Sequence, residues 1–180
     1  SWADPQQQTK PKAWAGYTLP QLADAVGARV RRDGVTPTWV QVGNETRTGL
    51  LWPEGDATKH MDNYARFVDS GYGAVKQVFP DAIVIVHVDN CHDNATFRWN
   101  FDGLKAHGAR FDMIGVSSYP TTAKNHTWQS ATAACLANLN DMVHRYGKPV
   151  ILSEVGVPWD HPDGKAVIAD LIAKARAVDG

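Results

Sequence analysis

The sequence predicts an α/β fold, a (β/α)8 barrel of which this chain holds a part. Four short apolar runs begin about 30 to 45 residues apart, the length of a strand–helix unit, and amphipathic segments separate them. Such alternation indicates a parallel sheet covered by helices, which a doubly wound sheet satisfies equally. Polar residues end each run, as at the rim of a barrel, and no glycine-rich nucleotide-binding turn follows an early strand. These two features favour the barrel.

The first predicted elements are a helix, a strand and a second helix. Residues 19–32 have a helical pattern and lead into the mostly apolar run 38–44, which predicts a buried strand. Within 59–78, apolar side chains recur every three or four residues, and Pro80 follows. This spacing predicts an amphipathic helix.

The middle of the chain repeats the strand–helix order. Residues 82–90 contain β-branched side chains at nearly every other position and are the clearest strand. Residues 96–107 predict a helix, with Gly108 suited to its carboxyl-terminal cap. Residues 111–120 predict the third strand.

The last predicted elements follow the same order. Residues 128–146 predict a helix ended by Gly147, and 149–156 the fourth strand. Residues 164–178 predict a final amphipathic helix. A barrel typically needs about 250 residues. We therefore expect residues 1–180 to be part of a single catalytic barrel domain, without its earlier strands and its last strand.

Composition excludes several classes of protein. A formal net charge of −1 and a pI near 6.6 provide no basic patch for nucleic acid. No segment approaches the roughly 18 apolar residues of a membrane-spanning helix, so no membrane insertion is expected, and the amino terminus is not a signal peptide. Cys91 and Cys135 form neither a disulfide framework nor a zinc motif, so we expect two unpaired structural cysteines.

Two glutamates directly follow apolar strands, unlike most of the other acidic residues. Glu45 ends the run WVQVGN and Glu154 the run VILS. Two carboxyl groups at one rim fit glycoside hydrolysis, with retention when they lie about 5 to 5.5 Å apart and inversion when they are farther apart. The alternative is that one or both form structural ion pairs, for example with Arg47.

The sequence around these glutamates resembles glycoside hydrolase family 53, the endo-β-1,4-galactanases, within a clan of retaining barrel glycosidases. The resemblance covers most of the chain through WADPQQQTKPKAW, VQVGNETRTGLLWPEG, HVDN, FDMIGVSSYP and SEVGVPW. It implies that Glu45 is the acid/base on strand four and Glu154 the nucleophile on strand seven. It also implies that Asn44 binds the sugar 2-hydroxyl.

Three further polar residues near strand ends are candidate substrate-binding residues. His87 and Asp89 lie two apart on one strand and therefore face the same side, where they could bind sugar or position Glu45. A buried, satisfied His–Asp pair is the alternative. Tyr119 could donate a hydrogen bond to Glu154 or remain half-buried with its hydroxyl in water.

Tryptophans supply candidate stacking surfaces for a sugar chain, because pyranose C–H groups pack on indole rings. Trp2 and Trp52 are expected on rim loops, and Trp159 follows Glu154 closely. Trp39 begins a strand and Trp99 lies inside a helix, so both are expected to be packing residues.

The expected activity is retaining endo-hydrolysis of β-1,4-galactan or galacto-oligosaccharides, which the resemblance places in a secreted, periplasmic or cell-surface protein. The alternatives are a glycosidase of the same clan for another β-linked polymer and a non-catalytic carbohydrate-binding fragment. No cofactor is expected and no metal ligand set is evident. Some family members bind calcium after strand seven, but the short link VGVPWDHPDG argues against that site here.

Overall fold

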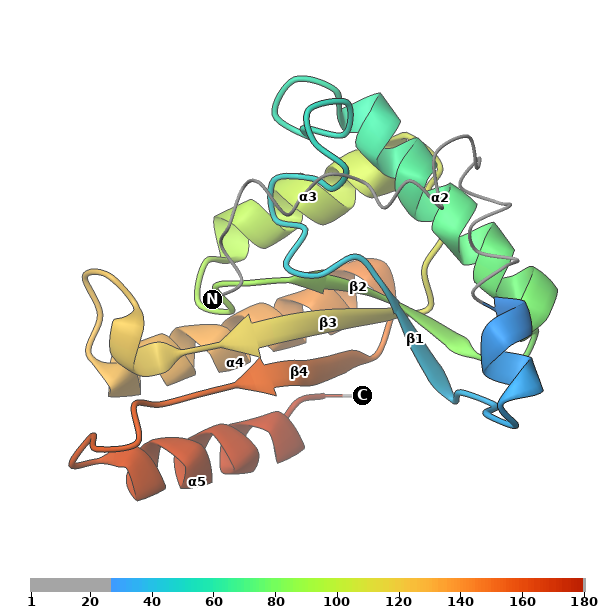
Figure 1. Cartoon of the computed structure of the whole chain (residues 1–180). Helices are drawn as coiled ribbons and strands as arrows, with labels where there is room; N and C mark the ends of the chain where they lie inside the picture. The colour runs from blue at the N-terminus through green and yellow to red at the C-terminus, as the bar shows by residue number, and fades with distance from the viewer. Residues whose placement is uncertain (1–26, 180) are drawn as a thin grey trace, which may run out of the picture.

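The computed structural model describes residues 27–179 and contains one four-stranded parallel sheet (Figure 1). The strands lie side by side in chain order, as expected for consecutive strand–helix units. They are β1 (Trp39–Val42), β2 (Ile83–Val88), β3 (Met113–Ser118) and β4 (Val150–Val155).

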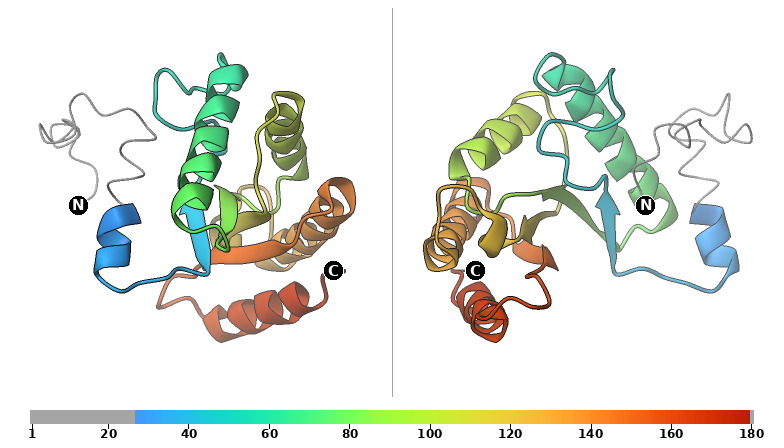
Figure 2. Two further views of the ribbon diagram at one scale, coloured as in Figure 1. Left: turned by 90° about the vertical axis from the view of Figure 1, so that its right-hand side faces the viewer. Right: turned by 60° about the vertical axis from the view of Figure 1, so that its left-hand side comes forward.

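Four long helices follow the strands and form an arc along one side of the curled sheet (Figure 2). They are α2 (Met61–Val78), α3 (Asn94–Ala106), α4 (Trp128–Tyr146) and α5 (Gly164–Arg176), with a 3-10 turn, η3 (Pro120–Thr122), after β3. Residues 27–32 are also helical, and the rest of the helix predicted over 19–32 lies outside the described residues. No helix in the described part of the chain is long and apolar enough to cross a membrane.

Local capping residues determine where these helices begin and end. The side chain of Asp93 accepts a hydrogen bond from the backbone N–H of Thr96, so α3 begins at Asn94 rather than at the predicted Thr96. The side chain of Thr127 caps α4 in the same way. Gly147 ends α4 in the left-handed region, at a φ of +61°, where glycine has no steric penalty.

The hydrophobic core lies between the sheet and the helices, and it fixes which strand residues face the other side. Alternate residues of β2 and β3 point into this core, so the residues between them, among them His87 and Ser117, face the opposite side of the sheet. The core-facing strand residues and their main helix partners are Val86, Val88, Ile114, Val116, Val68, Phe97, Phe101, Leu104, Leu139 and Met142.

A β-bulge in β4 determines the direction of Glu154. Val116 pairs with Leu152, but the next residue of β3, Ser117, pairs with Glu154, so Ser153 is an extra residue on β4. Leu152 packs against the core on the helix side. Simple alternation would place Glu154 on the same side as Leu152. The extra residue instead aligns Glu154 with Ser117, on the face opposite the helices.

The expectation of two unpaired cysteines is wrong, because Cys91 and Cys135 form a disulfide. Cys91 follows β2 and Cys135 lies in α4, 44 positions later, with the two Cα atoms 4.8 Å apart. Both residues are buried. The side-chain N–H of Asn138, one turn further along α4, donates to the carbonyl of Cys91 at 2.9 Å. The pairing depends on how α4 packs across the sheet, which local sequence patterns do not specify.

Removing this disulfide should destabilise the protein strongly. For a loop closed by residues 44 positions apart, chain entropy alone predicts a loss of about 4 kcal/mol in the free energy of unfolding. We expect this loss in a variant carrying Cys91→Ala and Cys135→Ala, measured by urea unfolding without reductant. Adding reductant should lower the stability of the wild type and leave the double variant unchanged. A loss below about 1 kcal/mol would contradict a structural role for this bridge.

Candidate active site

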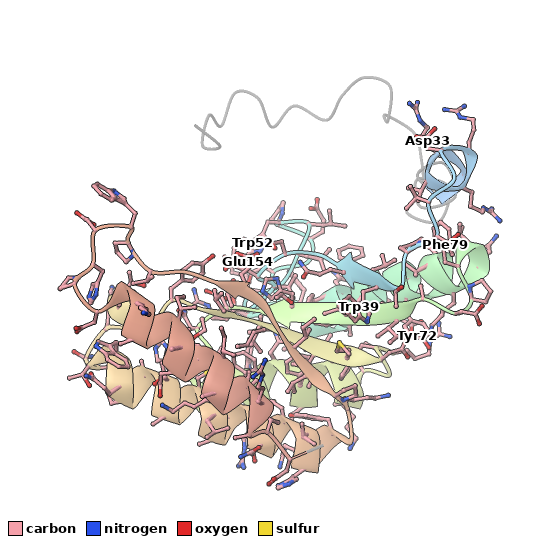
Figure 3. The ribbon with its side chains drawn as sticks, turned by 90° about the horizontal axis from the view of Figure 1, so that it is seen from below. Asp33, Trp39, Trp52, Tyr72, Phe79 and Glu154 are labelled. Carbon is pink, nitrogen blue, oxygen red and sulfur yellow. A yellow bond between two sulfur atoms is a disulfide. The ribbon has the colours of Figure 1, made fainter. Side chains whose placement is uncertain are left out.

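Glu154 occupies the inward face of the sheet and contacts residues from the two preceding strand ends. Its Oε2 accepts a hydrogen bond of 2.8 Å from the hydroxyl of Tyr119, which confirms the predicted contact. Its Oε1 lies 3.9 Å from Nδ1 of His87. The side chain of Glu154 is 37% exposed, so the carboxylate is held by neighbours and still open to a ligand. Figure 3 draws Glu154 and Trp52 at the same end of the sheet.

The ring of Tyr119 reaches Glu154 by lying against the backbone after β4. A Cβ atom on Gly156 would come within 2.5 Å of the Tyr119 ring, so glycine is needed for this approach. The hydrogen bond to Glu154 raises the pKa of Tyr119, with smaller contributions from burial and from the charges of Glu154 and Glu45. The phenol therefore remains protonated and is able to donate to the carboxylate.

His87 lies beneath Glu154 and is not in contact with solvent. Its imidazole is fully buried, and Nε2 is 2.7 Å from the hydroxyl of Ser117. Burial lowers the pKa of His87, and the nearby charges of Glu154, Glu45 and Asp89 only partly oppose this effect. The ring is consequently neutral at pH 7, and Nδ1 faces Glu154 at 3.9 Å without a hydrogen-bond partner among the described residues.

Asp89 forms an ion pair with Arg47 and not with His87. Arg47 is therefore not available to neutralise Glu45 or Glu154. The Nε atom of Arg47 lies 3.5 Å from Oδ1 of Asp89, and this ion pair replaces the satisfied His–Asp pair considered from the sequence. Among residues 27–179, the imidazole of His87 is the only basic group within 4.0 Å of Glu45 or Glu154. Within the same residues, no three side chains of His, Cys, Asp or Glu gather as metal ligands.

Asn44 and Glu45 are exposed in the turn directly after β1. The side-chain N–H of Gln41 donates to Oδ1 of Asn44 at 3.1 Å, which leaves the Asn44 amide N–H group available to a ligand. The charge of Glu45 acts on the pKa of both His87 and Tyr119, as does that of Glu154. Glu45 directly follows β1 and Glu154 lies near the end of β4, so the same sheet carries two carboxyl groups at its strand ends, as acid–base and nucleophilic chemistry requires.

The predicted tryptophans of the described residues differ in their exposure and in the elements that carry them. Trp52 is 57% exposed on the loop after β1, and Trp2 lies outside the described residues. Trp159 is 96% exposed and borders an apolar hollow beside α5. The packing expected for Trp99 is wrong, since it is 42% exposed, and Trp39 is 54% exposed. Trp39 lies on an edge strand of the described sheet, and Trp99 on a part of α3 that faces away from the core.

Three buried polar residues beneath the Glu45 turn were not expected from the sequence. Thr46, Tyr64 and Asn100 are each at most 1% exposed and contact one another. Tyr64 was expected only as part of the apolar stripe of its helix. Asn100 lies between Phe97 and Phe101 on α3, and an amide within such a stripe is the one sequence signal that could have identified the group.

Comparison with known proteins identifies the relatives of this chain. The family model described as glycosyl hydrolase family 53 matches residues 1–177. An uncharacterised protein of Niallia circulans is 36% identical over 91% of this chain and 47% of its own length. An arabinogalactan endo-β-1,4-galactanase of Thermothelomyces thermophilus is 32% identical over 91% of this chain and 51% of its own length. The chain therefore spans about half the length of the curated relatives it matches.

A solved structure supports the same conclusion. A fungal β-1,4-galactanase superposes on 99% of this chain and 61% of its own, with a TM-score of 0.80 and 28% sequence identity. This match confirms the prediction that the described sheet and helices form part of a (β/α)8 barrel. By sequence and by fold, the chain belongs to glycosyl hydrolase family 53.

Proposed function

We propose that the protein is an endo-acting glycoside hydrolase that cleaves β-1,4-galactan with retention of configuration. The observation that carries this proposal is the pair Glu45 and Glu154, the first directly after β1 and the second near the end of β4, with Glu154 in contact with Tyr119 and His87. The similarity to the arabinogalactan endo-β-1,4-galactanase of Thermothelomyces thermophilus supports galactan as the substrate. Residues 1–180 would be part of one catalytic domain, completed by strands outside this chain.

In the proposed first step, Glu154 attacks the anomeric carbon of a β-galactosyl unit while Glu45 protonates the leaving oxygen. The glycosidic C–O bond breaks as the bond to Glu154 forms, giving an α-linked galactosyl enzyme. In the second step, Glu45 takes a proton from water, and the water oxygen displaces Glu154. The released sugar has the β configuration, and both glutamates return to their starting protonation states.

Neighbouring side chains have defined tasks in this proposal. Tyr119 donates to Glu154 and keeps the carboxylate oriented for attack. The neutral ring of His87 supports the same carboxylate without a competing positive charge. Asn44 donates to the sugar 2-hydroxyl, a contact that strengthens as positive charge develops on the ring. Trp52 provides an exposed indole on which a galactosyl unit stacks.

The Cys91–Cys135 disulfide supports a location outside the reducing cytosol. Disulfides persist in secreted, periplasmic and cell-surface proteins. A polymeric galactan would be met in such a location. We therefore propose a secreted or cell-surface enzyme.

The test is a substrate panel measured with the protein that carries the complete barrel. Reducing ends should be released from β-1,4-galactan, with far less from mannan and cellulose, and NMR of early products should detect the β anomer first. Faster hydrolysis of mannan or cellulose would overturn galactan as the substrate. Binding to galactan without product release would overturn catalysis, and an initial α anomer would overturn retention.

A further inference from the structure

A buried hydrogen-bonded group lies directly under the turn that carries Glu45. It consists of Thr46 in that turn, Tyr64 from α2 and Asn100 from α3, all almost fully buried. Buried polar side chains are unfavourable unless their hydrogen bonds are made. Here one polar side chain from each of two neighbouring helices forms hydrogen bonds with the same residue of the turn. Packing alone does not require such an arrangement.

Thr46 joins the turn to the end of β2. Its backbone N–H and its hydroxyl both donate to the carbonyl oxygen of His87, at 2.8 and 3.0 Å. The hydroxyl of Tyr64 lies 2.8 Å from the hydroxyl of Thr46. Either hydroxyl can be the donor in this contact, because Thr46 also reaches the carbonyl of His87 and Tyr64 also reaches Oδ1 of Asn100. Burial raises the pKa of Tyr64 to about 12, so its proton is retained throughout the working pH range.

Asn100 binds the backbone on the other side of the same residue. Its side-chain N–H group donates to the carbonyl oxygens of Thr46 and Arg47, at 3.0 and 2.9 Å. Its Oδ1 lies 3.3 Å from the hydroxyl of Tyr64 and accepts from it as a weaker second partner. The backbone N–H, the carbonyl and the side chain of Thr46 are therefore all fixed by residues outside the turn.

The residue before Thr46 needs this support, because Glu45 has a φ of +48°. Residues with a Cβ atom adopt the left-handed region only when the surrounding structure imposes it. The bonds to Thr46 fix the next peptide against β2 and α3. They therefore restrain the backbone from which the Glu45 side chain extends.

We propose that Tyr64 and Asn100 are positioning residues for the acid/base glutamate Glu45 and act through Thr46. This inference rests on the proposed function, in which Glu45 protonates the leaving oxygen. Proton transfer requires hydrogen-bond distance and alignment, and a displacement of about 1 Å can reduce a rate about 100-fold. Loosening the turn should therefore impair proton donation selectively, without impairing attack by Glu154.

The test replaces Tyr64 with Phe in the complete protein and compares two substrates. Galactan has a poor leaving group and needs protonation, whereas a dinitrophenyl β-1,4-galactobioside does not. We expect kcat/KM of Tyr64→Phe to fall about tenfold on galactan and to change less than about twofold on the aryl substrate. Asn100→Leu and Thr46→Val should show the same selective fall in kcat/KM on galactan. Thr46→Ser keeps the hydroxyl and should retain the wild-type ratio of the two kcat/KM values.

Tyr146→Phe is the matched control. It removes the same atom from a second tyrosine, which is partly buried and whose hydroxyl donates to Asp102 at 2.8 Å on the opposite side of α3. Its ratio of the two kcat/KM values should equal that of the wild type. An equal fall on both substrates with Tyr64→Phe, or no fall on galactan, would overturn the positioning role.

A failure of this inference is distinguishable from a failure of the proposed function. If Glu45→Gln lacks the leaving-group selectivity, Glu45 is not the acid/base and the proposed function fails. If Glu45→Gln has the selectivity and Tyr64→Phe lacks it, only the positioning role fails. Thermal unfolding curves should show that each variant is still folded at the assay temperature, so that rates are compared between folded proteins.

Discussion

Replacing Glu154 with Gln should reduce kcat/KM on galactan at least about 10⁴-fold, because the variant lacks the attacking carboxylate. Gln has nearly the same shape and can still accept the hydrogen bond from Tyr119, so the fold should be preserved. The measurement is initial-rate release of reducing ends by the protein with the complete barrel. Its free energy of unfolding should be measured in parallel.

The sequence contains one other glutamate, Glu54, and this residue provides a matched control. Glu54 is exposed on the loop after β1, so Glu54→Gln makes the same chemical change near the site without affecting attack. Its activity should remain within about twofold of the wild type. Activity of Glu154→Gln within about tenfold of the wild type would contradict its assignment as the nucleophile.

Replacing Glu45 with Ala should reduce kcat/KM on galactan by about 10² to 10⁴, the range typical of general acid catalysis. The loss should be much smaller on the dinitrophenyl galactobioside, because its leaving group departs without a proton. Azide should then accelerate turnover of the aryl substrate, since it attacks the galactosyl enzyme without needing a base. The measurement is the azide dependence of kcat together with NMR of the product.

The configuration of the azide product separates the two roles. Azide that replaces the water of the second step gives a β-galactosyl azide with Glu45→Ala. Azide that replaces the missing nucleophile in Glu154→Ala attacks the substrate itself and gives the α product. If Glu45→Ala yielded the α-azide, the assignments of the two glutamates would have to be exchanged.

Much of the fold is predictable because its signals are local. The bounds of α4 match the prediction because Gly147 ends it and Thr127 caps its start. Where bounds differ, a backbone turn outweighs the apolar pattern. β1 ends at Val42 and not at the predicted residue 44, because Gly43 has a φ of +80°. β3 ends at Ser118 and not at the predicted Pro120, because Pro120 is the first residue of η3.

The site is less predictable because it depends on contacts between elements. The strand-end positions of Glu45 and Glu154 follow from the sequence, since apolar runs determine which residues emerge at the rim. The contact between His87 and Glu154 depends on pairing between strands distant in the chain. The disulfide and the group around Thr46 likewise depend on how helices pack, which no window of sequence contains.

The extra residue in β4 has an evolutionary consequence. Deleting Ser153 would keep every residue of the proposed chemistry and yet restore strict alternation. The carboxylate of Glu154 would then turn from the face opposite the helices toward the apolar layer under the helices. The protein would lose its nucleophile through a change in chain length alone, with no change in the nucleophile's identity. Insertions and deletions in this strand should therefore be tolerated far less than substitutions of Ser153 itself.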